Sequence, residues 1–263
     1  MKVFYADHFV LPLPEGHRFP MRKYSMLREA VQTFAPQTLE EAPAARDDEL
    51  LLAHDAAYVA RMSNGTLTAS EVRQIGFPWS PGMAERARRS AGATIAAARA
   101  SLRDRCGINL AGGTHHAFAD HGEGFCCYND AAVAARVLQR DCTVGRVLIC
   151  DLDVHQGNGT ARIFAGDASV FTFSMHGERN YPVRKEQSSL DVELPDGCTD
   201  APYLAALRDH LPRIVRSFEP EAMIYLAGAD PFEGDRLGRL KLSKAGLAER
   251  DRYVLTFARE WAI

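Results

Sequence analysis

Short apolar runs alternate along the chain with longer stretches whose apolar residues recur at helical spacing. The runs expected to form strands are 2–5, 108–111, 146–151, 169–173 and 222–227. The runs in the middle of the chain are almost continuously apolar, as strands buried on both faces of a parallel sheet must be. This alternation is typical of βαβ units and predicts an α/β fold with a central, mostly parallel sheet.

Residues that can cap a helix precede most of the amphipathic stretches. Each offers a side-chain oxygen to the free N–H groups of a first helical turn: Ser80, Asn129, Thr199 and Ser243. The helices expected are 24–34, 48–62, 81–103, 130–140, 200–218 and 244–260. The long loops expected are 63–81, 114–128, 155–159 and 176–195. Loops of this length in a compact domain are more often functional than idle.

Composition narrows the class of protein. The chain has 263 residues with 46% hydrophobic and 25% charged side chains, which suits a single domain over residues 1–263. Its net charge of −3 gives no basic surplus, so we expect neither nucleic acid nor a membrane surface as partner. Without a long apolar run or a signal-peptide core, we expect a cytoplasmic protein. The six cysteines form no CxxC pair, so we expect free thiols and no zinc ribbon.

Histidine and aspartate cluster where four of the expected strands end. The four segments are GGTHH at 112–116, DLDVH at 151–155, SMHG at 174–177 and GAD at 228–230. In open parallel sheets, ligands bind just beyond the carboxyl ends of the strands. We therefore expect the four segments to converge on one rim of the sheet.

The DLDVH segment has the pattern of a metal site. Asp151, Asp153 and His155 alternate, so an extended backbone places their side chains on one side. Two carboxylates beside an imidazole repel or titrate unless a cation lies between them. Such ligands suit Zn²⁺, and Fe²⁺ also accepts them. We take Asp153 and His155 as ligands, with Asp230 as the third; the alternative is that an aspartate caps a loop and His155 lies on the surface.

The adjacent histidines at 115 and 116 suggest proton transfer. One neutral imidazole can take a proton from water while a charged one donates to a leaving group. Each needs a partner on its other ring nitrogen, and Asp151 and Asn158 are candidates. The alternative is a surface pair. Phe125, in the glycine-containing segment 122–128, could line an apolar channel or simply pack within its loop.

Four segments together resemble the signature blocks of the zinc-dependent histone deacetylase family. They are GGTHHA (112–117), GFCCYND (124–130), DLDVHQGNGT (151–160) and GADPFEGDRLG (228–238). The family includes acetoin utilization proteins and bacterial amidohydrolases that act on acetylated amines such as acetylpolyamines. PLPEGHRFPMRKY (12–24) and SMHGERNYP (174–182) are most similar to its class IV branch and bacterial relatives. The resemblance implies a three-layer α/β/α, arginase/deacetylase-like domain.

The resemblance also implies roles for individual residues. Asp153, His155 and Asp230 match the metal ligands, and His115 and His116 match the catalytic histidine pair. Asp151 and Asn158 match the residues that orient the pair, the second being aspartate in many members. The expected substrate-channel residues are Phe125, Tyr181 and Gly124. A structural K⁺ would be held by Asp151, Asp153, His155, Ser174 and Met175, and a second K⁺ by Phe164, Asp167 and Val170.

The chain departs from the family pattern in two places. The rim aspartate that grips the substrate backbone would fall within residues 76–79, where no acid occurs. The tyrosine that hydrogen-bonds the developing oxyanion would fall just past Ile263, where this sequence stops. We therefore expect a domain that is shortened at its C-terminus.

These patterns lead to a first hypothesis and two alternatives. The first is a zinc-dependent deacetylase that removes an acetyl or other acyl group from N-acyl-lysine or a small acylated amine. His115 would act as base on water, and His116 as acid toward the amine. The second is a weak or inactive metal-dependent acyl-amine binding protein, because the oxyanion tyrosine is missing. The third, an arginase-like ureohydrolase, would need two metals and more carboxylates. The sequence leaves homo-oligomerisation open.

Overall fold

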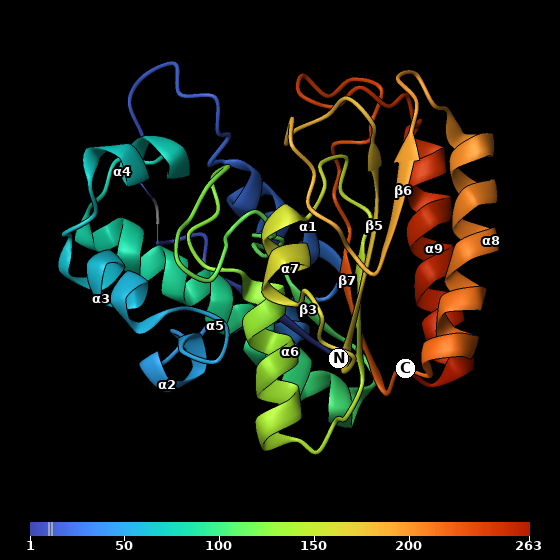
Figure 1. Ribbon diagram of the computed structural model, residues 1–263, viewed down its shortest axis with the longest axis horizontal. Helices are drawn as coiled ribbons and strands as arrows, with labels where there is room; N and C mark the ends of the chain where they lie inside the picture. Colours follow the sequence, from blue (N-terminus) through green and yellow to red (C-terminus); the bar gives the residue numbers. More distant parts are fainter. Residues whose placement is uncertain (10, 12) are drawn as a thin grey trace. The chain divides into compact units, whose positions relative to one another are not determined.

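The computed structural model describes residues 1–9, 11 and 13–263. Pro12, the first residue of the class IV-like segment 12–24, lies outside the described residues. The chain divides into two compact units, unit 1 (Met1–Cys142) and unit 2 (Thr143–Ile263), and each is described by itself (Figure 1). The single domain over residues 1–263 stays a prediction.

Unit 1 is built on a small parallel sheet in the order β2-β1-β3. The strands are β1 Lys2–Tyr5, β2 Leu39–Glu41 and β3 Gly107–Asn109. The helices are α1 Lys23–Phe34, α2 Asp47–Leu50, α3 Ala56–Asn64, α4 Ala69–Ile75, α5 Pro81–Asp104 and α6 Asp130–Asp141, with a 3₁₀ turn at Pro36–Thr38. The long helix α5 packs on β1, β3 and α6, and its alanines form a thin apolar layer with Phe4 and Ala6.

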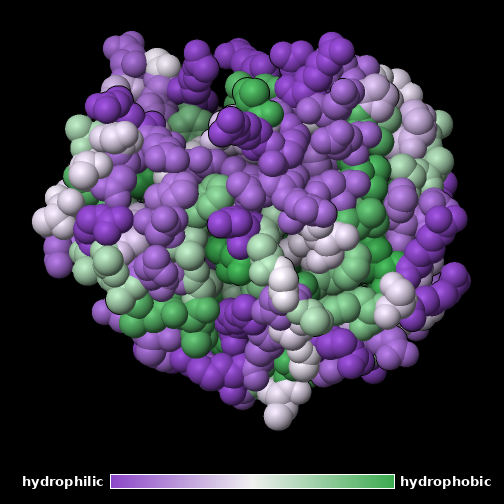
Figure 2. All heavy atoms as spheres, in the orientation of Figure 1, coloured by the Kyte–Doolittle hydropathy of each residue, from purple (hydrophilic) through white to green (hydrophobic). Residues whose placement is uncertain are grey.

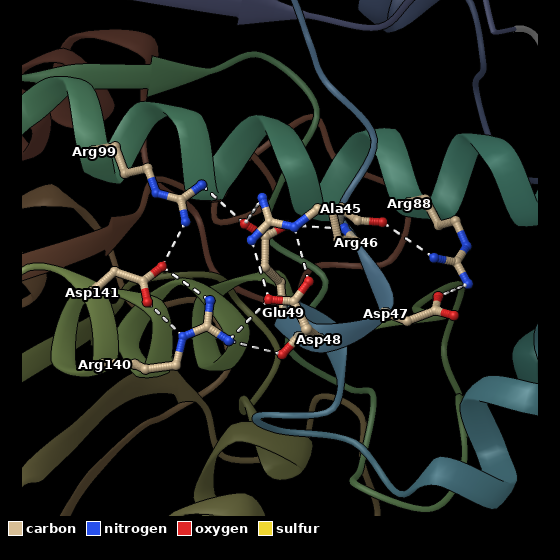
Figure 3. Close-up of polar contacts among 9 residues, drawn as sticks. All are labelled: Ala45, Arg46, Asp47, Asp48, Glu49, Arg88, Arg99, Arg140 and Asp141. Atoms are coloured by element: carbon tan, nitrogen blue, oxygen red, sulfur yellow. Dashed lines mark hydrogen bonds and ion pairs between the residues drawn. The ribbon is translucent and has the colours of Figure 1, made fainter.

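Ion pairs join the short helix α2 to α5 and α6 (Figure 3). The buried carboxylate of Glu49 lies 2.9 Å from the guanidinium of Arg99 on α5. Arg99 also reaches Asp141 at the end of α6, at 2.7 Å. Arg140 pairs with Asp141 and with Asp48 of α2. The hydrogen bonds from Arg140 and Arg99 hold the pKa of Asp141 well below its usual range.

Unit 2 is built on a parallel sheet in the order β6-β5-β4-β7. Its strands are β4 Val147–Asp151, β5 Val170–Gly177, β6 Leu190–Leu194 and β7 Ala222–Leu226. Its helices are α7 Asn158–Ile163, α8 Asp200–Phe218 and α9 Lys244–Trp261. The helices α8 and α9 run side by side along this sheet (Figure 1). They bury one apolar core against it, which includes Phe173, Leu207 and Val254.

The pairing register in unit 2 aligns the carboxyl ends of β4 and β7 and sets them beside the middle of β5. Asp151, the last residue of β4, stands opposite Ser174 of β5 and Leu226 of β7. The segments that follow β4 and β7 therefore leave the sheet at one edge, and residues 174–177, the last part of β5, lie at the same edge. The sequence predicted this edge for three of its four strand-end segments; the fourth, at 112–116, belongs to unit 1.

Several element boundaries differ from the prediction. The expected helix 48–62 is divided into α2 and α3, because buried His54 in the turn between them bonds to the backbone of Phe118 and Asn129. The helix α4 lies within the expected loop 63–81, and begins at a capping box formed by Thr68 and Glu71. The strand β6 lies within the expected loop 176–195.

Three of the four expected helix caps form. Ser80, Asn129 and Ser243 accept hydrogen bonds from the backbone N–H groups of Met83, Ala132 and Gly246. Thr199 makes no such bond, so that expectation is wrong. The carboxylate of the next residue, Asp200, accepts hydrogen bonds from Ser243 at the start of α9 instead.

The structure confirms the α/β class with parallel strands and flanking helices, as two sheets rather than one central sheet. All six cysteines are free thiols. Within the described residues, no helix combines the length and hydropathy needed to cross a bilayer. Hydrophilic residues cover most of the face drawn in Figure 2, and hydrophobic ones gather in narrow groups between them.

Candidate metal centre and histidine pair

The end of β4 forms one side of a cluster of acidic groups. Asp151 is buried, and its carboxylate accepts a hydrogen bond of 3.1 Å from the backbone N–H of Asp153. Asp153 in turn accepts from the backbone N–H of His155 at 2.9 Å. These bonds fold the chain sharply after the strand and point the side chains of Asp153 and His155 to the same place.

Asp230, after β7, reaches this cluster from the neighbouring strand. Its Oδ1 accepts a hydrogen bond of 2.9 Å from the backbone N–H of Val154. The His155 Nδ1 lies 3.0 Å from both Asp153 Oδ1 and Asp230 Oδ2. Gly228 makes this approach possible, since a Cβ there would lie 2.6 Å from the Cα of Asp153. One donor atom from each of these three residues lies within 4.8 Å of the others.

The close packing changes the acidity of these groups. Burial alone would lower the pKa of His155, but its hydrogen bonds with Asp153 and Asp230 and their charges outweigh burial and raise the pKa to about 10. Burial and the charge of Asp153 raise the pKa of Asp230 to about 6, against the opposing effect of His155. Without a metal, a proton on His155 therefore offsets one of the two carboxylate charges.

The donor set fits a divalent cation of the zinc type. Two carboxylate oxygens and one imidazole nitrogen converge, and three protein ligands are the usual number where a coordination position stays open for substrate. Zn²⁺ and Fe²⁺ both accept such ligands. A cation between these atoms would replace the proton on His155 as the balancing charge.

Two further sets of predicted ligands lie in unit 2. Ser174 and Met175 are buried in β5, where Ser174 Oγ lies 2.9 Å from His176 Nδ1. Phe164 and Val170 are also buried. Asp167 accepts hydrogen bonds from the backbone and hydroxyl of Ser169. Their roles as potassium ligands stay predictions.

The histidine pair lies in unit 1, on the loop that leads to α6. Both side chains are buried, and their ring centroids are 4.1 Å apart. The side-chain amide of Asn129 donates to the carbonyls of His115 and Ala117, which fixes the loop on the start of α6. Gly124 packs on His116 so closely that a Cβ would lie 2.7 Å from its ring.

Asp130 supports the same loop and was missed in the sequence. Its carboxylate accepts hydrogen bonds from the backbone N–H groups of Gly113 and Thr114 and from the hydroxyl groups of Thr94 and Thr114. The side chain is buried at the first residue of α6. Acidic residues are common in the first turn of a helix, so the position of Asp130 in the sequence does not indicate that it binds the loop at residues 113 and 114.

Phe125, the expected channel residue of unit 1, belongs to an aromatic cluster with His17, Phe19 and Phe77. Its ring centroid lies 5.2 Å from that of Phe77 and 5.4 Å from that of Phe19. His17 stacks on Phe77 and lies 3.0 Å from the carbonyl of Gly76. Phe77 is thus part of an apolar cluster. His17 and Phe19 lie in the class IV-like segment 12–24, but no role was predicted for either.

The remaining predicted residues lie in unit 2. Asn158 is buried at the start of α7. Tyr181 is 42% exposed, and its carbonyl accepts a hydrogen bond from Gln156. The buried side chain of Gln156, also missed, bonds to the backbone of Glu186 and to Asp191. The structure thus brings together Asp153, His155 and Asp230 within unit 2, and His115, His116 and Gly124 within unit 1.

The family model of the histone deacetylase domain matches residues 17–263 of this chain. The chain belongs to the histone deacetylase family. It is 43% identical to an uncharacterized protein of Picosynechococcus sp. (strain ATCC 27264 / PCC 7002 / PR-6), over 97% of this chain and 86% of that protein. It is 30% identical to the acetoin utilization protein AcuC of Staphylococcus aureus, over 91% of this chain and 68% of that protein.

A solved structure agrees with this assignment. A histone deacetylase homologue complexed with SAHA has a TM-score of 0.82 and 26% identity, covering 96% of this chain and 75% of that chain. The predicted family and its deacetylase-like α/β fold are therefore confirmed. Membership of the histone deacetylase family supports hydrolase activity on acetylated substrates, and this family generally uses zinc.

Proposed function

We propose that the protein is a zinc-dependent amidohydrolase that removes an acetyl or other acyl group from N-acyl-lysine or a small acylated amine. The convergence of Asp153, His155 and Asp230 at the edge of the unit 2 sheet carries this proposal. These three residues would hold Zn²⁺ or Fe²⁺. When bound, such an ion supplies Lewis-acid polarisation of the amide carbonyl and of the attacking water.

In this proposal the histidine pair moves the protons. A ring nitrogen of His115 takes the proton from the attacking water, and His116 gives a proton to the leaving amine. Two buried imidazoles whose centroids are 4.1 Å apart disfavour a charge on both at once, which suits one base and one acid. Asp151 and Asn158 would orient the two rings. Because residue 158 is asparagine, it adds no negative charge to hold the second histidine protonated.

Other residues would line the substrate channel or hold structural potassium ions. Phe125, Gly124 and Tyr181 would line the acyl channel. Residues 76–79 offer no carboxylate, so we infer that recognition depends on the acyl group and the amine rather than on a peptide backbone. We also propose structural potassium at Asp151, Asp153, His155, Ser174 and Met175, and a second potassium at Phe164, Asp167 and Val170.

Acetate release from acetyl-lysine peptides and acetylated polyamines by the zinc-loaded protein tests the proposal. We expect His115→Ala to lower the rate about 10²–10⁴-fold, the usual contribution of a general base. His8→Ala, which changes an exposed histidine of the same unit, is the matched control and should leave the rate unchanged. A wild-type rate in His115→Ala at equal zinc content would contradict the assignment.

The same assay separates the alternatives. Binding of acetyl-lysine peptide to the zinc-loaded protein without acetate release would favour the acyl-amine binding protein. A content of two divalent metal ions per chain, with potassium left out of the count, would favour the ureohydrolase. One zinc per chain together with acetate release is the result we expect.

A further inference from the structure

Arg250 is a buried cation in unit 2 that the proposed mechanism does not use. It lies on α9, is 1% exposed, and is one of the largest fully buried side chains in the described residues. Burying a guanidinium is costly unless its N–H groups find acceptors. The positions of its acceptors therefore indicate what the side chain does.

Arg250 bonds to both loops that carry the candidate metal ligands. Its Nη1 donates to the carbonyl of Leu152 at 3.2 Å and to the carbonyl of Gly228 at 2.7 Å. Leu152 directly precedes Asp153, and Gly228 is two residues before Asp230. One nitrogen atom thus links the backbone after β4 to the backbone after β7.

Neighbouring side chains fix the guanidinium in this position. Asp251 Oδ1 accepts from Arg250 Nε at 2.8 Å, and the same oxygen accepts from the hydroxyl of Tyr225 on β7 at 2.6 Å. The Arg250 Cζ lies 6.0 Å from the centroid of the Tyr225 ring. The buried hydroxyl of Tyr203 on α8 donates to the carbonyl of Leu152 at 3.5 Å. The guanidinium is therefore held between a carboxylate, an aromatic ring and two carbonyls.

We propose that Arg250 is a positioning residue of the metal centre, which sets the distance between the carboxylates of Asp153 and Asp230. This rests on the metal centre of the proposed function. The planar guanidinium serves several acceptors in fixed directions, whereas a lysine ammonium is a flexible point charge. Without these bonds the two loops lose their shared anchor, and the cost falls on metal binding rather than on proton transfer.

The test measures metal binding by the full chain in the wild type, Arg250→Met, Arg250→Lys and Arg252→Met. Arg252 is exposed on the same helix and provides the matched control. Affinities for Zn²⁺ and Co²⁺ come from chelator competition, and the visible spectrum of bound Co²⁺ reports ligand geometry. Thermal unfolding without metal gives the folded fraction of each variant.

We expect Arg250→Met to weaken Zn²⁺ binding about 10–100-fold, as loss of a residue that orients ligands usually does. We also expect a changed Co²⁺ spectrum, partial rescue in Arg250→Lys and wild-type behaviour in Arg252→Met. If Arg250→Met does not fold, the spectrum and affinity of Arg250→Lys decide. Wild-type affinity and spectrum in the folded variant would overturn the proposal, even if its melting temperature falls. Absence of metal binding in the wild type would overturn this proposal and the proposed function together.

Discussion

His54 lies in the turn between α2 and α3 and bonds through both ring nitrogens. The backbone N–H of Asn129 donates to Nε2 at 2.9 Å, so Nδ1 carries the hydrogen and donates to the carbonyl of Phe118 at 2.9 Å. Burial lowers the pKa of His54 to about 4, against the raising effect of its backbone bonds to Phe118 and Ala119. The folded protein therefore keeps this histidine neutral.

A lowered pKa makes His54 a source of acid sensitivity. The unfolded chain takes up a proton below about pH 6.5 while the folded chain does not, so stability is present above that pH and is lost as the pH falls toward about 4. Between pH 7.5 and pH 5 we expect His54 to account for a loss of about 2 kcal/mol in the free energy of unfolding. Urea unfolding at pH 7.5 and at pH 5 measures this loss in the free energy of unfolding.

Substitution separates His54 from the other titrating groups. His54→Gln keeps a polar side chain but removes the titration, so its free energy of unfolding should depend less on pH than that of the wild type. His8→Gln, at an exposed histidine, should keep the wild-type dependence. Equal pH dependence in His54→Gln and the wild type would show that the neutral histidine is not the cause.

At the residue scale, the sequence could predict that Asp153, His155 and Asp230 lie together, but not the groups that support them. Asp153 and His155 alternate after an apolar strand, and that local pattern is visible in the sequence. Asp130, Gln156 and Arg250 act through hydrogen bonds to backbone atoms of other segments. Those partners become neighbours only when the chain folds, so no spacing in the sequence indicates them.

At the scale of elements, burial on both faces made some strands predictable. The strand β4 is buried at every residue, and its apolar run predicted it almost to the residue. The edge strands β2 and β6 are short and half-buried, and their mixed sequences LEE and LDVEL were not recognised. Helix α4 could have been found, since Thr68 and Glu71 have the spacing of a capping box.

Helix α2 is too short to be stable by itself, and Glu49 is its buried ion-pair partner for α5. Its carboxylate accepts from the backbone N–H of Arg46 and from the guanidinium of Arg99, and it is 3% exposed (Figure 3). We expect Glu49→Ala to lower the free energy of unfolding by about 2 kcal/mol, because the buried ion pair and its hydrogen bonds are lost. The loss stays moderate because Arg46 and Arg99 are partly exposed and regain contact with water.

An exposed pair on α5 provides the control for Glu49. Glu85 pairs with Arg89 one turn later, with 41% of its side chain exposed. Glu85→Ala should change the free energy of unfolding by no more than about 0.5 kcal/mol. Urea unfolding compares both variants with the wild type. Equal losses in the two variants would show that the buried pair does not hold α2 in place.

At the scale of the whole molecule, metal binding and folding should be linked. The candidate ligands come from the segments after β4 and β7, and an unfolded chain does not hold them together. A ligand that binds only the folded state stabilises it, by about 2.7 kcal/mol at a free concentration of 100 times Kd. We therefore expect Zn²⁺ to raise the melting temperature of the wild type but not of His155→Phe.

The proton on His155 gives this linkage a defined pH dependence. With the pKa of His155 at about 10 and that of Asp230 at about 6, Zn²⁺ must displace about one proton between those pH values. Zn²⁺ affinity should therefore rise about tenfold per pH unit from pH 6.5 to 8. Calorimetry in buffers of different ionisation enthalpy measures the released proton directly. Zn²⁺ binding that releases no proton, or that stabilises His155→Phe equally, would place the metal elsewhere on the chain.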